Sequence, residues 1–341
     1  MPLISVSEPE PVKKKHSRNL HAPLCGIFFP NSVAVAENEF LTGSRRTARS
    51  EEEENQMKIK WHNENELHMQ VKENNGVTYL TYPSFEQFPD IVHCFSTRLG
   101  GVSQGIFSSM NLSFTRGDEE NAVKDNYRRL SAAVGFSLED IVTSDQTHTT
   151  NVQLVGAEDR GKGVTRPRTY KEVDGMLTNV PGVILCTFYA DCVPLYFVDP
   201  VHKAVGLSHS GWRGTVGKIG KVTIEKMAEQ FGSDPEEIFT AIGPSICQEC
   251  YEVSEDVILE FQKAFDEKYW EKLFYKKKNG KYQLDLWEAN HIIFLEAGIK
   301  EEHISMPGIC TCCNPEFLFS HRASHGRRGN LAAFLGIRRE K

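Results

Sequence analysis

The stretch around which the predicted fold is organised reads CVPLYFVDPVHKAVGLSH, residues 192–209. Two apolar segments, 193–198 and 203–208, flank the sequence DPVH, which is typical of an Asp-Pro turn. We expect these segments to pair as a β-hairpin in which Cys192 faces His209, with their Cβ atoms about 5 Å apart. A cysteine and a histidine, both good metal ligands, would then be neighbours at one end of a sheet.

A third ligand is expected at the same end of the sheet. The best candidate is His148 in SDQTHTTNV, a polar stretch before a strand-like run. Three protein ligands that leave a fourth position open are typical of a catalytic zinc site, where the ion holds a cysteine as thiolate and activates water. A single cysteine or histidine more often only fills a core, so the prediction depends on the three residues His148, Cys192 and His209 lying together.

Residues on either side of this hairpin add polar groups to the predicted site. Asp191 directly precedes the cysteine, and we expect it to orient a metal-bound histidine. The sequence SGWRGT follows His209 and predicts a Gly-rich turn into a helix N-terminus, where backbone N–H groups bind anions and Arg213 adds a cation.

Short strands and a few helices alternate from Met57 onward. Helices are predicted over 120–135, 214–232 and 285–298, the last with an Asp-x-x-Glu capping box. Strands are predicted over 90–98 and 182–190, and the sequence NNG at 74–76 predicts a tight turn between two further strands. Most connections are too short for crossover helices, so we expect one α/β (α+β) domain with mixed sheets flanked by helices.

Residues 1–56 differ from the rest of the chain, because their apolar residues follow no clean period and SEEEE stands near their end. A disordered leader and a start codon assigned too early both fit this pattern. The sequence leaves the true start, Met1 or Met57, open, and we expect the structured domain to cover 57–341.

Composition narrows the class of protein. Among 341 residues, 40% are apolar and the formal net charge is −7, so neither a nucleic-acid nor a membrane partner is indicated. Nine cysteines in a chain of this size indicate a reducing compartment, and we expect a cytoplasmic monomer or small homo-oligomer.

Seven motifs in order along residues 57–338 carry a family resemblance. They are STRLGGVSQGIFSSMNLS (96–113), DQTH (145–148), DGMLTN (174–179), ADCVP (190–194), HSGWRGT (209–215), AIGPSICQECYEV (241–253) and FSHRASHGRRGN (319–330). The chain resembles the laccase-domain or polyphenol-oxidase family, also described as zinc-dependent purine nucleoside phosphorylases and adenosine deaminases and including FAMIN. The resemblance implies a Cys-His fold similar to that of the cytotoxic necrotizing factors, with zinc held by His148, Cys192 and His209.

The resemblance also implies a reaction. It implies phosphorolysis of adenosine, inosine, guanosine and S-methyl-5′-thioadenosine, together with hydrolytic deamination of adenosine. Phosphorolysis needs an anion site and polarisation of the departing purine, and our candidates for phosphate are Arg98, Arg213 and Arg322, ahead of Arg327 and Arg328. Asn111 and Asp174 are candidates for substrate binding, although Asn111 would equally suit a loop asparagine that satisfies its own turn. Asp191 or Asp174 could shuttle a proton.

Three alternatives remain open. Cys192 and His209 could form a hydrolase without metal, with the cysteine as nucleophile. A copper-dependent phenol oxidase is also attached to the family, but the chain has no His-x-His pair of the kind that a tri-copper centre uses. The pairs Cys247/Cys250 and Cys310/Cys313 could bind a structural zinc, although about 60 residues separate them and free thiols fit this spacing better.

Overall fold

The computed structural model describes residues 58–62 and 69–339, which belong to one of the two units into which the chain divides, Met57–Lys341. The interpretations of residues 1–56 as a leader or an early start lie outside the described residues. Within the described ranges, none of the helices has the length and apolar character needed to cross a bilayer.

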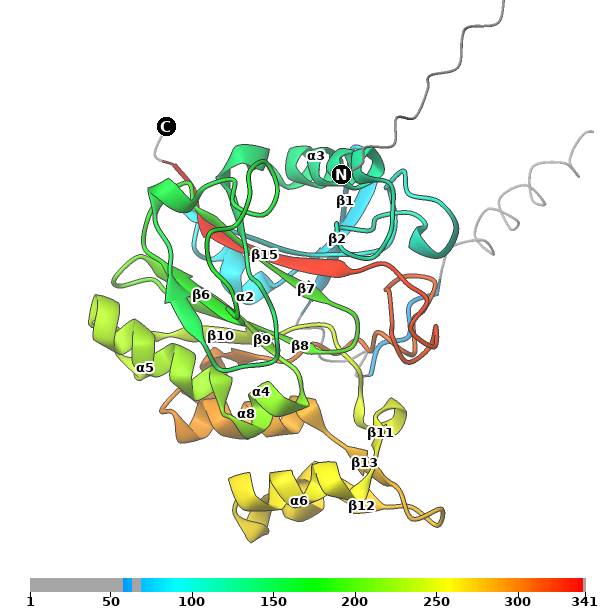
Figure 1. The fold of residues 1–341 in the computed structure, drawn as a ribbon. Coiled ribbons are helices and arrows are strands. Elements are labelled where there is room, and N and C mark those ends of the chain that lie inside the picture. The colour runs from blue at the N-terminus through cyan, green and yellow to red at the C-terminus, as the bar shows by residue number, and fades with distance from the viewer. Residues whose placement is uncertain (1–57, 63–68, 340–341) are drawn as a thin grey trace, which may run out of the picture. The chain divides into compact units, whose positions relative to one another are not determined.

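Two six-stranded mixed sheets form the centre of the described part (Figure 1). The first sheet contains, in spatial order, β1 (Gln70–Asn74), β2 (Val77–Thr81), β3 (Ile91–Ser96), β15 (Leu331–Ile337), β7 (Ile184–Tyr189) and β4 (Ile141–Thr143). The second contains β14 (Ile304–Ser305), β10 (Phe239–Ile242), β8 (Val193–Asp199), β9 (Ala204–Ser210), β6 (Gly175–Thr178) and β5 (Val152–Leu154). A small third sheet has the order β11 (Glu252–Val253), β13 (Tyr282–Leu284) and β12 (Phe274–Lys276).

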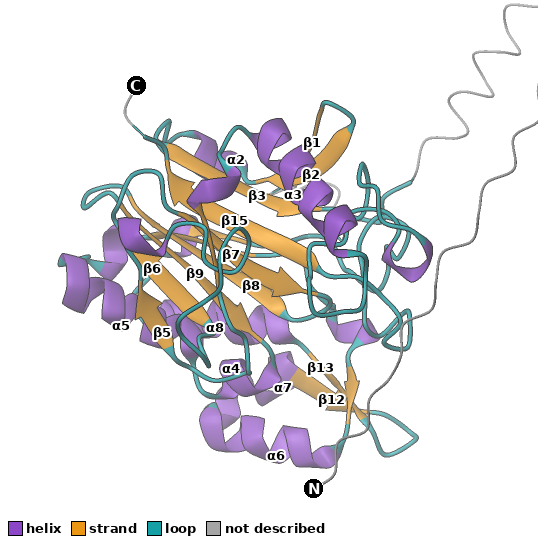
Figure 2. Ribbon diagram, turned by 45° about the horizontal axis from the view of Figure 1, so that its top comes forward, coloured by secondary structure: helices purple, strands orange, loops and turns teal. Residues whose placement is uncertain are grey.

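Helices flank the two large sheets (Figure 2). Helix α3 (Glu120–Val134) packs on the first sheet, while α5 (Ile219–Phe231) and α8 (Leu286–Glu296) pack on the second. The other α-helices within residues 69–339 are α2 (Pro83–Glu86), α4 (Trp212–Val216), α6 (Glu255–Ala264) and α7 (Trp270–Leu273). The mixed α/β class predicted from the sequence is confirmed.

Alternation along β15 shows how the layers are held together. Leu331, Ala333 and Leu335 face the apolar cluster between the two sheets, whereas Ala332 and Phe334 face the cluster under α3. Successive side chains of a strand point to opposite faces, so a strand covered on both faces must be apolar throughout. Burial of both faces explains why β15 is apolar throughout and why β7 and β8 are apolar apart from Thr187 and Asp199.

Several predicted element ends are confirmed. Asn75 and Gly76 both have positive φ in the turn between β1 and β2, as a type I′ hairpin requires. Gly135 ends α3 in the left-handed conformation, with its N–H bonded to the Ser131 carbonyl. The Asp285 carboxylate accepts a hydrogen bond from the N–H of Glu288 and so begins α8.

The predicted helix over 214–232 is wrong in one respect, since two helices occupy this stretch. Lys218 adopts the left-handed conformation (φ 54°, ψ 43°) and separates α4 from α5. Its ammonium pairs with Glu296 of α8 at 2.8 Å and lies 5.4 Å from the centre of the Phe265 ring. Contacts with other elements of the fold therefore hold this residue in a conformation that local sequence does not favour.

The predicted register of the hairpin is also wrong, by two residues. Asp199 still belongs to β8 and pairs with Ala204, and its carboxylate accepts hydrogen bonds from the backbone N–H groups of Val201 and His202. The turn therefore keeps its length of four residues but lies one residue later, at 200–203, and Pro194 faces His209 in place of Cys192. A shift of two residues keeps every side chain on its face, so Cys192 and His209 become diagonal neighbours.

Candidate metal centre and active site

The structure brings together His148, Cys192 and His209 from three separate segments. Each offers one ligand atom, and these atoms all lie within 4.8 Å of one another. The Cys192 Sγ lies 3.9 Å from the His148 Nε2, and the two imidazole rings are 4.9 Å apart between centres. Zinc bonds of about 2.3 Å to sulfur and 2.0 Å to nitrogen place such atoms about 3.6 Å apart in a tetrahedron. The donor set and its spacing therefore fit a zinc ion with one position left for a ligand.

Asp174, at the residue before β6, holds two of the three candidate ligands, His209 and His148, in place. Its buried carboxylate lies 2.9 Å from the His209 Nδ1, which leaves the Nε2 of that ring as the ligand atom. The same carboxylate accepts hydrogen bonds from the successive backbone N–H groups of Thr147, His148 and Thr149. These bonds fix the loop in which His148 has a positive φ of 65°. Asp174 is thus a positioning residue, although the sequence made it a candidate for contact with substrate.

Charges within the cluster perturb the pKa values of its members. Burial alone would raise the pKa of the Cys192 thiol, but the charges and hydrogen bonds of His209 and His148 lower it to about 6. Burial alone would lower the pKa of His209, but the Cys192 thiolate and Asp174 raise it to about 9. The hydrogen bonds of His209 and of the Thr147–Thr149 loop lower the pKa of Asp174 to about 2 against the effect of its burial. The cluster therefore favours a thiolate near neutral pH, the form that binds metal or attacks a substrate.

Gly211, directly before α4, leaves room for the ligands. A Cβ atom at this position would lie 2.8 Å from the His148 Cδ2 and 3.2 Å from the Cys192 Sγ. Its φ of −73° is open to any residue, so the requirement for glycine here is purely one of space. The Gly-rich turn that follows His209 thus keeps space free beside His148 and Cys192.

Asp191 does not orient a histidine in the structure. Its two carboxylate oxygens accept hydrogen bonds from the Thr311 hydroxyl at 2.7 Å and from the Arg322 N–H at 2.7 Å. These bonds, together with one from the Ile246 N–H to its carbonyl, hold a residue whose φ is 93°. Asp191 therefore fixes the bend that presents Cys192, and Asp174 takes the histidine-orienting position that the sequence analysis assigned to Asp191.

A cavity of about 1130 Å³ opens over the three ligands and is large enough for a nucleoside. Arg116, Arg168 and Arg328 line it together with Phe114 and Phe188. Arg168 is paired with Asp145 at 2.8 Å. Arg328 is only 8% exposed, and its Nε has no hydrogen-bond partner among the described residues. A buried guanidinium with an unsatisfied donor is suited to bind an anion.

The predicted phosphate ligands lie elsewhere. Arg98 donates to the carbonyls of Ser108 and Pro315, and Arg322 donates to those of Cys250 and Glu252. The guanidinium of Arg213 lies over the Trp212 ring, 4.2 Å from its centre. None of the three arginines lines the large cavity, so their role as phosphate ligands stays a prediction that the geometry does not favour.

Asn111 is buried and its amide is satisfied within the protein. Its Oδ1 accepts from the N–H groups of Ser113 and Asn330, and its Nδ2 donates to Asp118. These partners agree with the alternative interpretation of a loop asparagine that satisfies its own turn, extended by one contact with the segment before β15.

Arg328 was expected to be a less suitable phosphate ligand than Arg98, Arg213 and Arg322. A signal was present, because GRRGN immediately precedes the apolar strand at 331–337. Since β15 lies next to β7, whose end leads to Asp191 and Cys192, the residues before β15 had to lie near the cysteine. That adjacency of strands is a property of the tertiary structure, and the sequence analysis did not predict it.

Comparison with known proteins places the chain in a family. Residues 92–338 match the family model described as "Multi-copper polyphenol oxidoreductase laccase". Residues 13–50 match a second model, described as a family of unknown function (DUF6783).

Relatives and solved structures agree with this match. The chain is 37% identical over 250 residues to "Purine nucleoside phosphorylase YlmD" of Bacillus subtilis, an alignment that covers 73% of this chain and 89% of the relative. It is 34% identical over 251 residues to "Adenosine deaminase RL5" of an unknown prokaryotic organism, covering 73% of this chain and 94% of that protein. The crystal structure of YlmD from Geobacillus stearothermophilus superposes with a TM-score of 0.74 and 36% identity, over 80% of this chain and 99% of the other. The chain therefore belongs to the multi-copper polyphenol oxidoreductase laccase family, whose members include proteins named purine nucleoside phosphorylase and adenosine deaminase.

Proposed function

We propose that this protein is a purine nucleoside phosphorylase with an additional adenosine deaminase activity. Its substrates would be adenosine, inosine, guanosine and S-methyl-5′-thioadenosine, with phosphate as the second substrate. The observation that carries the proposal is the position of His148, Cys192 and His209 beside a nucleoside-sized cavity that also contains the buried cation Arg328. The names of the relatives support the same chemistry.

His148, Cys192 and His209 would hold a zinc ion, which when bound supplies a Lewis acid and an activated water. Asp174 keeps the Nδ1 of His209 protonated and the loop of His148 in place. Asp191 fixes the bend before Cys192. The protein thus presents a rigid set of donors to the cavity, and rigidity is what an ordered catalytic site requires.

Phosphate would bind at Arg328, with Arg116 as a second cation. Both line the cavity, and the proximity of Arg116 adds to burial in lowering the pKa of Arg328 to about 10. Two guanidinium groups that repel one another are stabilised when an anion binds between them. Phe114 and Phe188 give the same cavity apolar walls against which a purine can pack.

Metal exchange tests this proposal. The protein would be stripped of metal with a chelator, reloaded with zinc or copper, and assayed with each nucleoside in the presence and absence of phosphate. We expect zinc to restore phosphate-dependent release of the free base, and to restore conversion of adenosine to inosine without phosphate. Restoration by copper alone, with oxidation of phenols, would instead support a copper-dependent phenol oxidase.

A metal-independent Cys-His hydrolase is the second candidate. It is favoured by two separate contacts, Cys192–His148 and His209–Asp174, and by the lowering of the Cys192 pKa to about 6. A nucleophilic thiolate needs such a partner and such a pKa. The test is hydrolytic activity in the metal-free protein. If this activity is undiminished without metal and is abolished by alkylation of Cys192, the hydrolase is favoured over the phosphorylase.

A further inference from the structure

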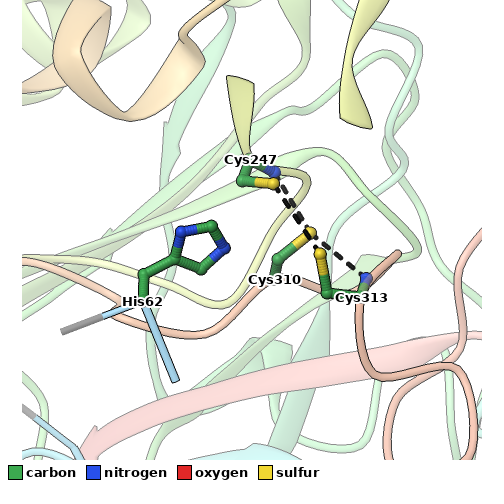
Figure 3. A group of neighbouring side chains, drawn as sticks. All are labelled: His62, Cys247, Cys310 and Cys313. Carbon is green, nitrogen blue, oxygen red and sulfur yellow. Dashed lines mark hydrogen bonds between the residues drawn. The ribbon is translucent and has the colours of Figure 1, made fainter. Parts of the chain in front are cut away.

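A second cluster of ligating side chains lies outside the cavity. His62, Cys247, Cys310 and Cys313 each offer one atom, and these four atoms all lie within 4.8 Å of one another (Figure 3). They come from three parts of the chain: residues 58–62, the loop after β10, and the turn at 310–313. Three of the four residues belong to the cysteine pairs that the sequence offered for a structural zinc, whereas His62 is an addition from the structure.

The cysteines of this cluster are free thiols at distances that suit coordination. The Sγ atoms of Cys247 and Cys313 are 4.0 Å apart. Tetrahedral zinc with Zn–S bonds of about 2.3 Å places two sulfurs about 3.8 Å apart, whereas a disulfide needs about 2.05 Å. The spacing is therefore that of two ligands of one ion.

Backbone groups already solvate one of the sulfurs as they would a thiolate. The Cys310 Sγ accepts hydrogen bonds from the N–H groups of Cys247, at 3.3 Å, and of Cys313, at 3.4 Å. Two N–H donors on one buried sulfur stabilise its ionised form, which is the form that binds metal. Both donors belong to other members of the cluster, so the loop geometry itself gathers the ligands.

His62 is held in position by contacts of its own segment. Its N–H donates to the Gly308 carbonyl, and its ring packs edge-on against Trp287 at 5.1 Å. The Asn314 side chain accepts from the Lys60 N–H and donates to the Lys60 carbonyl. These contacts tie the segment to the 308–314 region, so the imidazole closes the cluster from its exposed side.

We propose that His62, Cys247, Cys310 and Cys313 form a second metal centre, a closed Cys₃His zinc site with a structural role. Four protein ligands leave no position for a substrate, and three thiolates with one imidazole select zinc over harder cations. Each thiol loses its proton to solvent when the ion binds. His62 precedes the stretch that the family model matches, so the centre joins that stretch to the segment before it.

The second centre also supports the first one. Ile246, next to Cys247, donates its N–H to the Asp191 carbonyl, and Thr311, next to Cys310, donates its hydroxyl to the Asp191 carboxylate. Asp191 in turn fixes the bend before Cys192. Loss of zinc from the second centre should therefore loosen the catalytic loop as well as the segment of His62.

Zinc content of the full chain tests the proposal separately from the proposed function. We expect about two zinc ions per chain in the wild type and about one in each of Cys192→Ala and Cys310→Ser. Cys312→Ser, a change at a neighbouring thiol outside the ligand set, should keep both ions. The ion that remains in Cys192→Ala belongs to the second centre whether or not the protein acts on nucleosides.

Two further measurements keep the proposal testable. The first uses Cys192→Ala, in which the second centre is intact, in case Cys310→Ser does not fold. The second tests whether His62 or Cys250 is the fourth ligand. In Cys192→Ala, cobalt at the second centre should show a thiolate-to-metal charge-transfer band from three sulfurs. In Cys310→Ser, the remaining cobalt lies at the first centre with Cys192 as its one thiolate, so the band of Cys192→Ala should be about three times as intense. His62→Ala should weaken zinc retention, while Cys250→Ser should not. Loss of zinc in Cys250→Ser but not in His62→Ala would overturn the ligand set. Absence of metal from Cys192→Ala, or a disulfide among these cysteines, would overturn the site.

Discussion

At the residue scale, the space beside the proposed catalytic metal depends on Gly211 having no side chain. Gly211→Ala would bring a methyl group to 2.8 Å from the His148 Cδ2 and 3.2 Å from the Cys192 Sγ. We expect loss of zinc from the first centre and a fall in activity of roughly 100-fold, because small displacements of catalytic groups are costly. Zinc analysis and initial rates check this.

The comparison variant is Gly214→Ala in α4, where the nearest atom to a new Cβ is the His209 carbonyl oxygen at 3.3 Å, a milder contact than the one of 2.8 Å at Gly211. It should lose much less metal and activity than Gly211→Ala. Equal loss in the two variants would show that α4 is disturbed in general and that the space at Gly211 has no special role.

Arg328 is the residue on which phosphate binding is expected to depend. A hydrogen bond to a charged group contributes about 1.5–3 kcal/mol, so Arg328→Gln should raise the KM for phosphate roughly 10- to 100-fold. The KM for the nucleoside should change far less. Arg327→Gln, at the neighbouring position outside the cavity lining, serves as control. An unchanged phosphate KM in Arg328→Gln would remove this residue from the phosphate site.

His93 in β3 makes stability depend on pH. Burial lowers the pKa of its imidazole from 6.5 to about 4, and its Nε2 accepts a hydrogen bond from the Tyr82 N–H, which requires the neutral ring. Between pH 6.5 and 4 the unfolded chain binds the proton and the folded protein does not, so stability falls as the pH falls through this window.

The size of this effect is measurable by urea denaturation. From pH 7 to pH 4.5 the free energy of unfolding of the wild type should fall by roughly 2–3 kcal/mol more than that of His93→Gln, whose amide does not titrate. Parallel losses in the two proteins would contradict the assignment to His93.

At the element scale, helix α8 depends on its N-cap. The Asp285 carboxylate accepts from the Glu288 N–H at 2.9 Å, while burial raises its pKa to about 6. Asp285→Ala should lower the free energy of unfolding by about 1 kcal/mol. Asp285→Asn should be neutral or stabilising at pH 7, because a neutral amide caps without the cost of burying a charge. Equal destabilisation by both changes would mean that Asp285 stabilises the protein through packing and not through its hydrogen bond to the helix N-terminus.

Local signals predicted the elements whose ends are set locally. Gly135 and Asp285 carry their own cap chemistry, and Asn75-Gly76 carries its own turn. The break at Lys218 has no such signal, because its contacts with Glu296 and Phe265 come from distant parts of the chain. The hairpin register failed for a related reason, since the hydrogen bonds of the Asp199 side chain set the turn.

At the scale of the whole molecule, the ligand set His148, Cys192 and His209 could be selected from residue types and strand ends. The residues that position this set and line the cavity could not be selected in the same way. The roles of Asp174 and Asp191 depend on which loops meet, and the cavity position of Arg328 depends on β15 lying beside β7. His62 could not be predicted as a member of the cysteine cluster either, because its place there depends on pairing with a segment far along the chain.

Truncation tests how the two centres depend on the first residues of the domain. A chain that begins at Met57 should keep both zinc ions and full activity. A chain that begins at Met69 lacks His62 and the contacts of Lys60, so it should lose zinc from the second centre and melt at a lower temperature. Equal metal content and melting temperature in the two truncated proteins would contradict the role given to this segment.

The most direct test of the central claim is to identify by mass the products formed from adenosine in the presence of phosphate. The wild-type protein should yield ribose 1-phosphate in an amount equal to adenine plus hypoxanthine, because part of the adenosine is first deaminated to inosine, and Cys192→Ala should yield none of these products. If zinc-loaded wild-type protein forms no ribose 1-phosphate from adenosine or from any of the other proposed nucleosides, the cavity over Cys192 is not a phosphorylase site and the proposed function is wrong.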